Sequence, residues 1–263
     1  MRRDVTSSLS LSASGPARLV LSIAVADKER ADESLVVVQD GRELAITEVT
    51  DKHGTRLHTC DVTEGAVDVQ YRATVQGQSQ PAPVSDMDLI EYLRPSRYCE
   101  SDTLTPTAVA EAGGRSGLDL VSFVGSWVGT QLAYISGSSR PTDGAAETYM
   151  TRRGVCRDFA HLVIAMLRAM DVPARLVSVY APGLSPMDFH AVAEALVDGE
   201  WWAVDATTLA PRQTMVRIAT GRDAADTAFL TTIGEPLDLE SMEVTATADA
   251  LPADDVREFI RLG

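Results

Sequence analysis

The hydrophobic periodicity of the chain changes once, near residue 80, and this change limits the folds open to it. Before that point, short runs rich in Val, Leu, Ile and Thr alternate apolar and polar residues, a period of two that is typical of half-buried strands. The runs lie at residues 5–11, 18–25, 34–39, 44–49, 56–62 and 66–75. Asp40-Gly41 is a hairpin-turn signal between two of them. We therefore predict an all-β sandwich domain over residues 1–80.

Helical periodicity begins after a polar, proline-bearing segment, residues 76–83, which we interpret as a linker. Residues 118–135 carry apolar side chains at three- and four-residue steps, with Gly137 where a C-terminal glycine is expected. Residues 156–170 repeat this pattern and stop at Asp171 and Pro173. Both segments are predicted to be helices.

Strand-like runs return after the second helix, at residues 174–180, 189–197 and 201–206, with Asp198-Gly199 as a hairpin turn between the last two. The order of strands, helices and a hairpin predicts an α+β catalytic domain over residues 84–235. We expect residues 236–263, which are acidic and weakly patterned, to be a peripheral C-terminal tail that could hold a final strand and a short helix.

Composition excludes several classes of partner. A formal net charge of −15 repels phosphate backbones, so nucleic acid is not an expected partner. No apolar run has the length of a membrane span, and residues 1–20 lack the apolar core of a signal peptide. We expect a cytoplasmic protein without a membrane partner; the sequence does not reveal its oligomeric state.

The three cysteines, Cys60, Cys99 and Cys156, are widely separated and form no CxxC pair or Cys/His cluster. A zinc site is therefore not indicated, and neither a metal nor a cofactor is expected. An odd number leaves at least one thiol outside any internal disulfide. The simplest interpretation is three free thiols in a reducing compartment.

Cys156 is the cysteine best placed for chemistry. It falls in the first turn of the helix predicted from residue 156, where unpaired N–H groups and the positive end of the helix dipole stabilise a thiolate. Arg152, Arg153 and Arg157 add positive potential. A thiolate in this setting can attack a carbonyl, although a free cysteine is about as often a small buried hydrophobic residue.

His190 and Asp205 lie on the two strands of the predicted hairpin, so the Asp198-Gly199 turn brings them close together. A histidine oriented by a carboxylate and facing a thiol has the division of roles of a nucleophilic triad. Taken singly, each residue has an ordinary structural explanation: His190 as a hydrogen-bonded, partly buried side chain and Asp205 as a turn or cap residue.

The other histidines are weaker candidates. His53 and His58 lie near a predicted turn of the β region and are expected to be solvated. His161 is five residues beyond Cys156 on the same helix, so it points to a different face and is predicted to be structural.

Three segments in order resemble the motifs of bacterial transglutaminase-like proteins. Residues 153–162, continued by residues 167–178, resemble the nucleophile helix and the strand that follows it. Residues 188–194 look like the family's histidine strand, and residues 201–207 look like its aspartate strand. The resemblance covers roughly residues 150–210, with weaker similarity at residues 92–99 and 221–226, and each of the three motifs keeps its key residue.

This resemblance implies a papain-like α+β core behind an N-terminal β-sandwich. It implies acyl transfer or hydrolysis at an amide bond of a peptide or protein substrate, through a thioester on Cys156. His190 would move the proton and Asp205 would orient the imidazole, without a cofactor. Among proteases, amidases and transamidases of the family, the resemblance points most to a cysteine protease or amidase, although the sequence does not decide between hydrolysis and transfer to an amine.

Two positions depart from the family pattern. Many relatives have tryptophan two residues after the histidine, where this chain has Val192, and glutamine after the nucleophile, where it has Arg157. The roles of Arg212 and of residues 221–226 stay open. So do two other functions: an inactive transglutaminase-like fold that binds a partner protein, and a scaffold whose β domain does the work.

Overall fold

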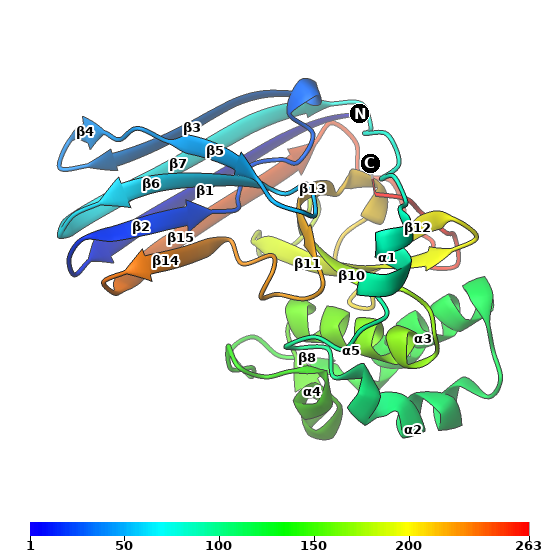
Figure 1. The fold of residues 1–263 in the computed structure, drawn as a ribbon. Helices are drawn as coiled ribbons and strands as arrows, with labels where there is room; N and C mark the ends of the chain where they lie inside the picture. Colours follow the sequence, from blue (N-terminus) through cyan, green and yellow to red (C-terminus); the bar gives the residue numbers. More distant parts are fainter. Residues whose placement is uncertain (263) are drawn as a thin grey trace.

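A β-rich unit and a helix-covered sheet make up the fold (Figure 1). The structure is a computed structural model that describes residues 1–262. In Figure 1 the β-rich unit lies at the upper left, a smaller sheet occupies the centre, and the helices pack below and to the right of that sheet. The predicted α+β class with a β-rich front is confirmed.

The β-rich unit is a sandwich of two antiparallel sheets, with strand orders β15-β1-β7-β3-β4 and β14-β2-β6-β5. Its strands are β1 (Arg2–Ala13), β2 (Ala17–Leu21), β3 (Ala31–Gln39), β4 (Arg42–Glu43), β5 (Thr47–Thr50), β6 (Arg56–Val62), β7 (Gly65–Gln76), β14 (Leu230–Gly234) and β15 (Leu237–Ala248), with a 3₁₀ turn η1 (Lys28–Arg30). Burial alternates along β7 as its sequence predicts. Leu9, Leu19 and Val69 are among the side chains that fill the space between the sheets.

The final strand expected within residues 236–263 is present as β15, but it belongs to the sandwich and is not part of a peripheral tail. This strand pairs with β1 along almost its whole length, from Arg3↔Ala248 to Ala13↔Leu237. Its first half is an exposed sheet edge, and only Val244 and Ala246 are buried. A strand with only two buried side chains shows little alternation of apolar and polar residues, so the sequence of this segment does not indicate a sheet strand.

The central sheet is antiparallel, with the order β12-β11-β10-β13. Its strands are β10 (Ala174–Tyr180), β11 (Phe189–Val197), β12 (Glu200–Val204) and β13 (Val216–Gly221), and the 3₁₀ turn η2 (Arg212–Thr214) precedes β13. The predicted hairpin is confirmed, and positive φ angles of 55° and 77° at Asp198 and Gly199 form its turn.

Five helices accompany this sheet among the described residues: α1 (Asp86–Glu91), α2 (Ser101–Ala112), α3 (Gly117–Gln131), α4 (Ala145–Thr151) and α5 (Cys156–Ala169). The most buried is α5, which packs against β10 and β11, whereas α2, α3 and α4 pack on α5. The helix predicted over residues 156–170 is therefore confirmed. Phe159, Leu162, Val163 and Leu167 lie in the core shared with β10 and β11.

The helix predicted over residues 118–135 ends earlier, at Gln131. Beyond it the chain is extended, and β8 (Ala133–Tyr134) pairs in parallel with β9 (Arg153–Gly154). The Ala133 N–H donates to the Arg152 carbonyl at 2.9 Å, and the Ile135 N–H donates to the Gly154 carbonyl at 3.0 Å. These tertiary hydrogen bonds outweigh the local preference for helix, because they satisfy backbone groups beside α5.

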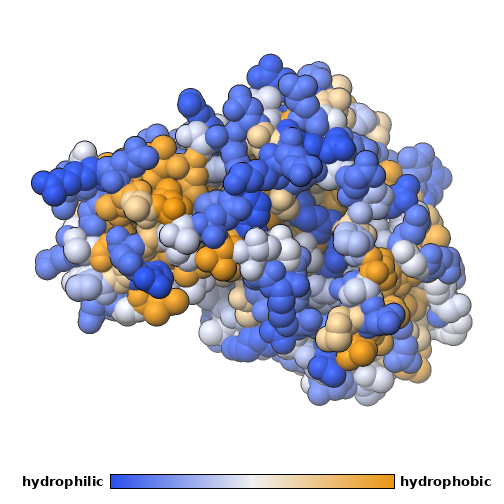
Figure 2. Space-filling view, turned by 45° about the horizontal axis from the view of Figure 1, so that its top comes forward, coloured by the Kyte–Doolittle hydropathy of each residue, from blue (hydrophilic) through white to orange (hydrophobic). Residues whose placement is uncertain are grey.

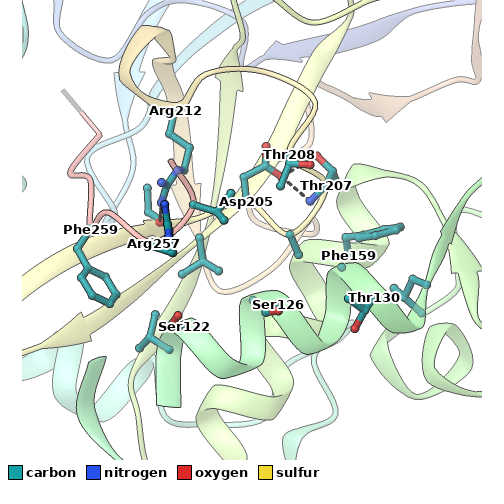
Figure 3. Close-up of a pocket in the computed structure, with 18 of the residues that line it drawn as sticks. Ser122, Ser126, Thr130, Phe159, Asp205, Thr207, Thr208, Arg212, Arg257 and Phe259 are labelled. Carbon is teal, nitrogen blue, oxygen red and sulfur yellow. Dashed lines mark hydrogen bonds between the residues drawn. The ribbon is translucent and has the colours of Figure 1, made fainter. Parts of the chain in front are cut away.

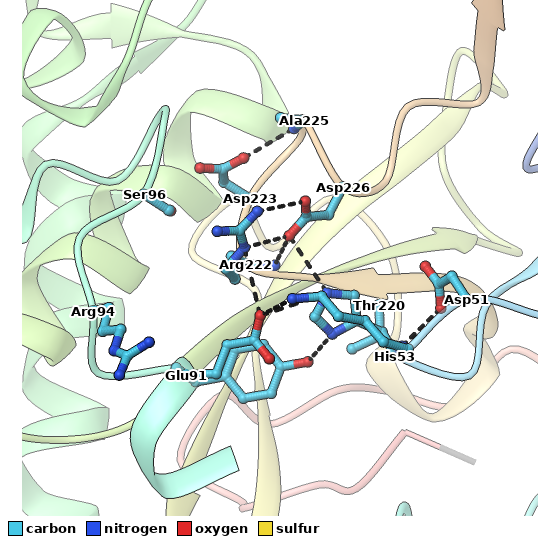
Figure 4. A network of polar contacts seen from close by, with 12 residues as sticks. Asp51, His53, Glu91, Arg94, Ser96, Thr220, Arg222, Asp223, Ala225 and Asp226 are labelled. Atoms are coloured by element: carbon cyan, nitrogen blue, oxygen red, sulfur yellow. Dashed lines mark hydrogen bonds and ion pairs between the residues drawn. The ribbon is translucent and has the colours of Figure 1, made fainter. Parts of the chain in front are cut away.

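A polar network joins the β unit to the helical part (Figure 4). His53, in the turn between β5 and β6, has Nδ1 2.7 Å from the Tyr92 hydroxyl and Nε2 3.6 Å from Asp226. Arg222 pairs with Asp226 at 2.8 Å and faces Glu91 at 3.7 Å. The expectation that His53 is solvated is wrong, because its side chain is only 4% exposed at this junction.

His58 is also buried, with Nε2 3.3 Å from a carboxylate oxygen of Glu48.

The hydropathy of one face is shown in Figure 2, where hydrophobic side chains gather over the β unit and hydrophilic ones cover most of the remainder. At the β3–β5 end of the unit, Leu35, Leu44 and Ile46 are only partly buried. Within residues 1–262, no helix has both the length and the apolar character to cross a bilayer.

The position of β15 predicts that its buried residues carry stability. Val244→Asp places an unpaired carboxylate between the sheets, and we expect it to lower the free energy of unfolding by about 3 kcal/mol or more, measured by urea denaturation. Ser241→Asp, which adds the same carboxylate at an exposed position of the same strand, is the matched control and should cost less than about 0.5 kcal/mol. Equal effects would contradict the pairing of β15 with β1.

Candidate active site

Cys156 occupies the first position of α5, directly after β9. Its side chain is partly exposed, unlike the buried Cys60 and Cys99. At Gly154 a Cβ would lie 2.6 Å from the Asp158 Cβ, so only glycine allows this tight approach to the helix. The thiol therefore lies at the end of the helix where unpaired N–H groups are available to an anion.

Asp158 and Arg157 fix the geometry of this helix start. The Asp158 carboxylate accepts hydrogen bonds from the Val155 N–H at 2.8 Å and from the Ser139 hydroxyl at 2.9 Å. Arg157 pairs with Asp158 at 3.0 Å and donates to the carbonyl of Arg140 at 2.9 Å. Arg157, which departs from the family pattern, thus ties the loop that precedes α4 to the nucleophile helix.

His190 and Asp205 are in direct contact. His190 Nε2 lies 2.9 Å from Asp205 Oδ2, and the side chains are 1% and 2% exposed. The other oxygen, Asp205 Oδ1, accepts from the Thr207 N–H at 2.9 Å and the Thr207 hydroxyl at 2.7 Å. Because Nε2 is engaged, Nδ1 is the ring nitrogen available to the thiol.

The electrostatics of the site favour a charged imidazole. Burial opposes the imidazolium, but the Asp205 carboxylate and then the Cys156 sulfur raise the pKa of His190 above its ordinary value. Burial likewise opposes ionisation of Asp205, yet the neighbouring imidazolium and the Thr207 donors hold the pKa of Asp205 below its usual value. The structure thus brings together all three residues predicted from the sequence.

Tyr134 of β8 also adjoins the nucleophile. Burial, followed by charge on the Cys156 sulfur, raises the pKa of Tyr134 to about 12. Its ring centroid lies 5.9 Å from that of Phe159, and the side chain is 45% exposed. The hydroxyl is therefore a polar group beside Cys156, on a residue that is partly exposed.

A cavity of about 440 Å³ adjoins the Asp205 side of the site. Figure 3 shows it between α3 and the chain that follows β12. The third wall comes from residues 254–260, which we name the C-terminal strap. Arg212 anchors the strap: its guanidinium pairs with Asp254 at 2.9 Å and donates to the Asp255 and Glu258 carbonyls at 3.0 Å. On the other side, the Ala203 N–H donates to the Ile260 carbonyl at 2.8 Å.

The remaining candidates have structural partners. His161 is fully buried, stacks on Tyr98 with centroids 5.3 Å apart, and accepts from the Ala224 N–H at 3.1 Å through Nε2. Asp223 accepts from the Tyr98 N–H at 2.9 Å. Residues 221–226 therefore pack the end of β13 onto α5 instead of contacting the triad. Val192, where relatives carry tryptophan, is buried in a core cluster with Val177 and Met215.

Sequence reasoning did not single out Tyr134 or Thr207. The signal for Thr207 was present, since a threonine two residues after an aspartate is a common partner for that carboxylate in a turn. Tyr134 was hidden because its segment continues the helical pattern of α3. Among residues 1–262, no group of three or more His, Cys, Asp or Glu side chains is arranged to hold a metal ion.

Comparison with known proteins places this fold in one class. Residues 106–206 match the transglutaminase-like superfamily. The structure of a candidate cysteine protease from Cytophaga hutchinsonii superposes with a TM-score of 0.85 and 35% identity, covering 100% of this chain and 93% of that one. The fold is therefore of the transglutaminase-like, cysteine-protease type.

Curated relatives are more distant. An uncharacterized protein of Mycobacterium leprae is 31% identical over 158 residues, which is 53% of each chain. One from Mycobacterium tuberculosis is 33% identical over 124 residues, covering 41% of this chain and 40% of the relative. The chain thus matches about half or less of the length of these relatives. From the full-length structural match and the family domain, the chain belongs to the transglutaminase-like superfamily.

The raised pKa of His190 predicts a pH dependence of stability. Its pKa is about 6.5 in an unfolded chain and higher when folded. The stabilisation is therefore complete below about pH 6.5 and is lost as pH rises through the folded pKa. Between mildly acidic and alkaline pH, the free energy of unfolding should fall more steeply in the parent than in His190→Gln. Urea titrations across this range measure it. Asp205, Asp188 and Cys156, the ionisable groups that face the His190 ring, are present in both proteins.

Parallel pH profiles for the parent and His190→Gln would contradict the raised pKa. Arg175→Gln is a poor control because it removes one of the two arginine partners of the buried Glu194. His58→Gln is the matched control: burial lowers the pKa of His58, so its loss should not flatten the pH profile.

Proposed function

We propose that this chain is a cysteine hydrolase or acyltransferase that acts at amide bonds of peptide or protein substrates. The observation that carries the proposal is a series of side-chain contacts. It runs from Cys156 at the start of α5, through the His190 ring, to the buried Asp205 carboxylate. Each group has the partner that its role in a thiol nucleophile–base–orienter arrangement needs.

In the first half of the reaction, the Cys156 sulfur attacks the amide carbonyl carbon and forms a tetrahedral intermediate. The Cys156 N–H at the end of α5 is directed to stabilise the oxyanion. The C–N bond then breaks, a thioester remains on sulfur, and His190 transfers its proton to the leaving amine. Asp205, fixed by Thr207, holds the imidazole in the tautomer and orientation that this transfer requires.

In the second half, His190 removes a proton from an incoming nucleophile, which attacks the thioester. Water yields the free acid and completes hydrolysis, whereas an amine yields a new amide and completes transfer. Either route restores the thiol of Cys156. Family membership and the similarity to a candidate cysteine protease support the hydrolytic route.

The first test replaces the nucleophile. Cys156→Ala should lower amide turnover on the order of a million-fold, to the background of the preparation. The measurement is mass spectrometry of a mixed peptide pool, together with detection of an acyl adduct on Cys156 in the presence of a labelled amine. Cys60→Ala, the same change in the β unit, is the matched control and should keep full activity. Equal turnover in Cys156→Ala and the parent would refute the nucleophile assignment.

Thiol labelling separates an enzyme from an inactive fold that only binds a partner. Burial raises the pKa of Cys60 to about 11 and also raises the pKa of Cys99, so these two thiols should resist iodoacetamide in the folded protein. Preferential labelling of Cys156 at mildly acidic pH supports the enzyme. Three unreactive thiols across the pH range would support the inactive fold.

The second test addresses orientation of the imidazole. Asp205→Asn keeps the shape of the side chain but removes the charge that fixes the His190 tautomer, so kcat should fall on the order of ten-thousand-fold while the protein remains folded. Residual activity should stay above that of Cys156→Ala. An Asp205→Asn variant with parental kcat would show that Asp205 is only a structural partner of His190.

A further inference from the structure

We propose that the cavity between α3 and the C-terminal strap is the subsite for an uncharged, mainly apolar side chain of the substrate peptide, close to the bond that Cys156 attacks. The inference rests on the proposed function for the identity of its ligand, and it adds a substrate class that the triad alone does not define.

The position of the cavity connects it to the triad. Tyr134 and Phe159 form one end of its lining, and Tyr134 is the residue that adjoins the Cys156 sulfur. Asp205 and Thr207 belong to the same lining, as Figure 3 shows. A peptide whose carbonyl reaches Cys156 can therefore place a neighbouring side chain in the cavity.

Small residues on α3 create the space. Ser122, Gly125, Ser126 and Gly129 face the chain that follows β12, and each lines the cavity. A Cβ on Gly129 would come within 2.6 Å of the Ala206 carbonyl oxygen, so α3 lies as close to this chain as backbone atoms allow. The glycines allow this close approach, and the short side chains of Ser122 and Ser126 leave the cavity beside it, which has the size of small-ligand pockets.

The charges around the cavity are already paired. Among the described residues of its lining, the charged side chains are Asp205, Arg212 and Arg257. Asp205 engages His190 and Thr207, and Arg212 engages Asp254 and strap carbonyls. Arg257 pairs with Asp255 at 2.6 Å and is 85% exposed. A charged ligand would lose solvation without gaining a counterion, so the cavity favours an uncharged one.

The residues that line the cavity also fit a substrate side chain that is mainly apolar. Val121, Val204 and Phe259 contribute apolar surface, whereas the hydroxyls of Ser122, Ser126 and Thr208 line the same space. Apolar contacts would bind the side chain, and hydroxyls can exchange hydrogen bonds with the peptide backbone. The occupant we infer is therefore a peptide segment with a leucine-like residue beside the reacting amide.

Photo-crosslinking tests the subsite without requiring turnover. Acetylated peptide amides with neutral mixed flanks and photo-leucine at the central position are irradiated with the full chain carrying Cys156→Ala, and mass spectrometry locates the adducts. We expect adducts on residues 121–130 and on the strap. Photo-lysine in the same position should give about tenfold fewer adducts, because its charge has no partner there.

Cavity-filling variants test whether the labelling takes place in this cavity. Ser126→Trp should lower photo-leucine labelling about tenfold, since one large apolar side chain contributes about that factor to binding. Ala110→Trp, at an exposed position of α2, should leave labelling unchanged. Ser122→Trp fills the other end of the same helix face and replaces Ser126→Trp if thermal unfolding shows that the latter is misfolded.

The outcomes separate this inference from the proposed function. Adducts on other segments, or labelling that Ser126→Trp and Ser122→Trp both leave intact, would overturn the subsite even if the parent cleaves peptides. Adducts lost in these variants would support the subsite even if the parent protein, assayed separately, showed no turnover.

Discussion

The contact between His190 and Asp205 is the interaction on which the site depends. Pairing of β11 with β12 runs to Ala193↔Val204, so Asp205 is the first residue beyond the end of the hairpin ladder. There the chain can turn, and both Thr207 donors reach the second carboxylate oxygen. A buried carboxylate needs such partners to stay ionised. The end of the hairpin thus provides a place where Asp205 can be buried, charged and directed at His190.

The thiol reaches this pair through the packing of α5 on the central sheet. Ala160 and Ala165 of α5 and Ala193 and Ala195 of β11 lie in one buried core, and small side chains at such a contact allow a helix to approach closely. The parallel pairing of β8 with β9 then fixes where α5 begins. Three segments distant in sequence therefore meet because the interior packs in one way.

Much of this could be predicted from the sequence because its signals are local. The helix at residues 156–169, the Asp198-Gly199 turn and the alternation of β7 depend on near neighbours, and the motif residues Cys156, His190 and Asp205 lie on those elements. The end of α3 could not be predicted, since hydrogen bonds from Ala133 and Ile135 to a segment about twenty residues away determine it. The burial of His53 was also inaccessible, because its partners Tyr92 and Asp226 come from distant parts of the chain.

Among the described residues, those of the C-terminal strap line the cavity but form no hydrogen bond with the triad. After crossing to β15, which completes the sandwich, the chain returns to the central sheet as the strap. There its polar contacts are with Arg212 and the outer edge of β12. The triad instead takes its hydrogen bonds from α5, β11 and Thr207. Under the proposed function, a change in the strap would alter a cavity wall without removing a hydrogen bond of His190 or Asp205. We therefore expect the strap to vary the accepted side chain while the reacting groups stay in place.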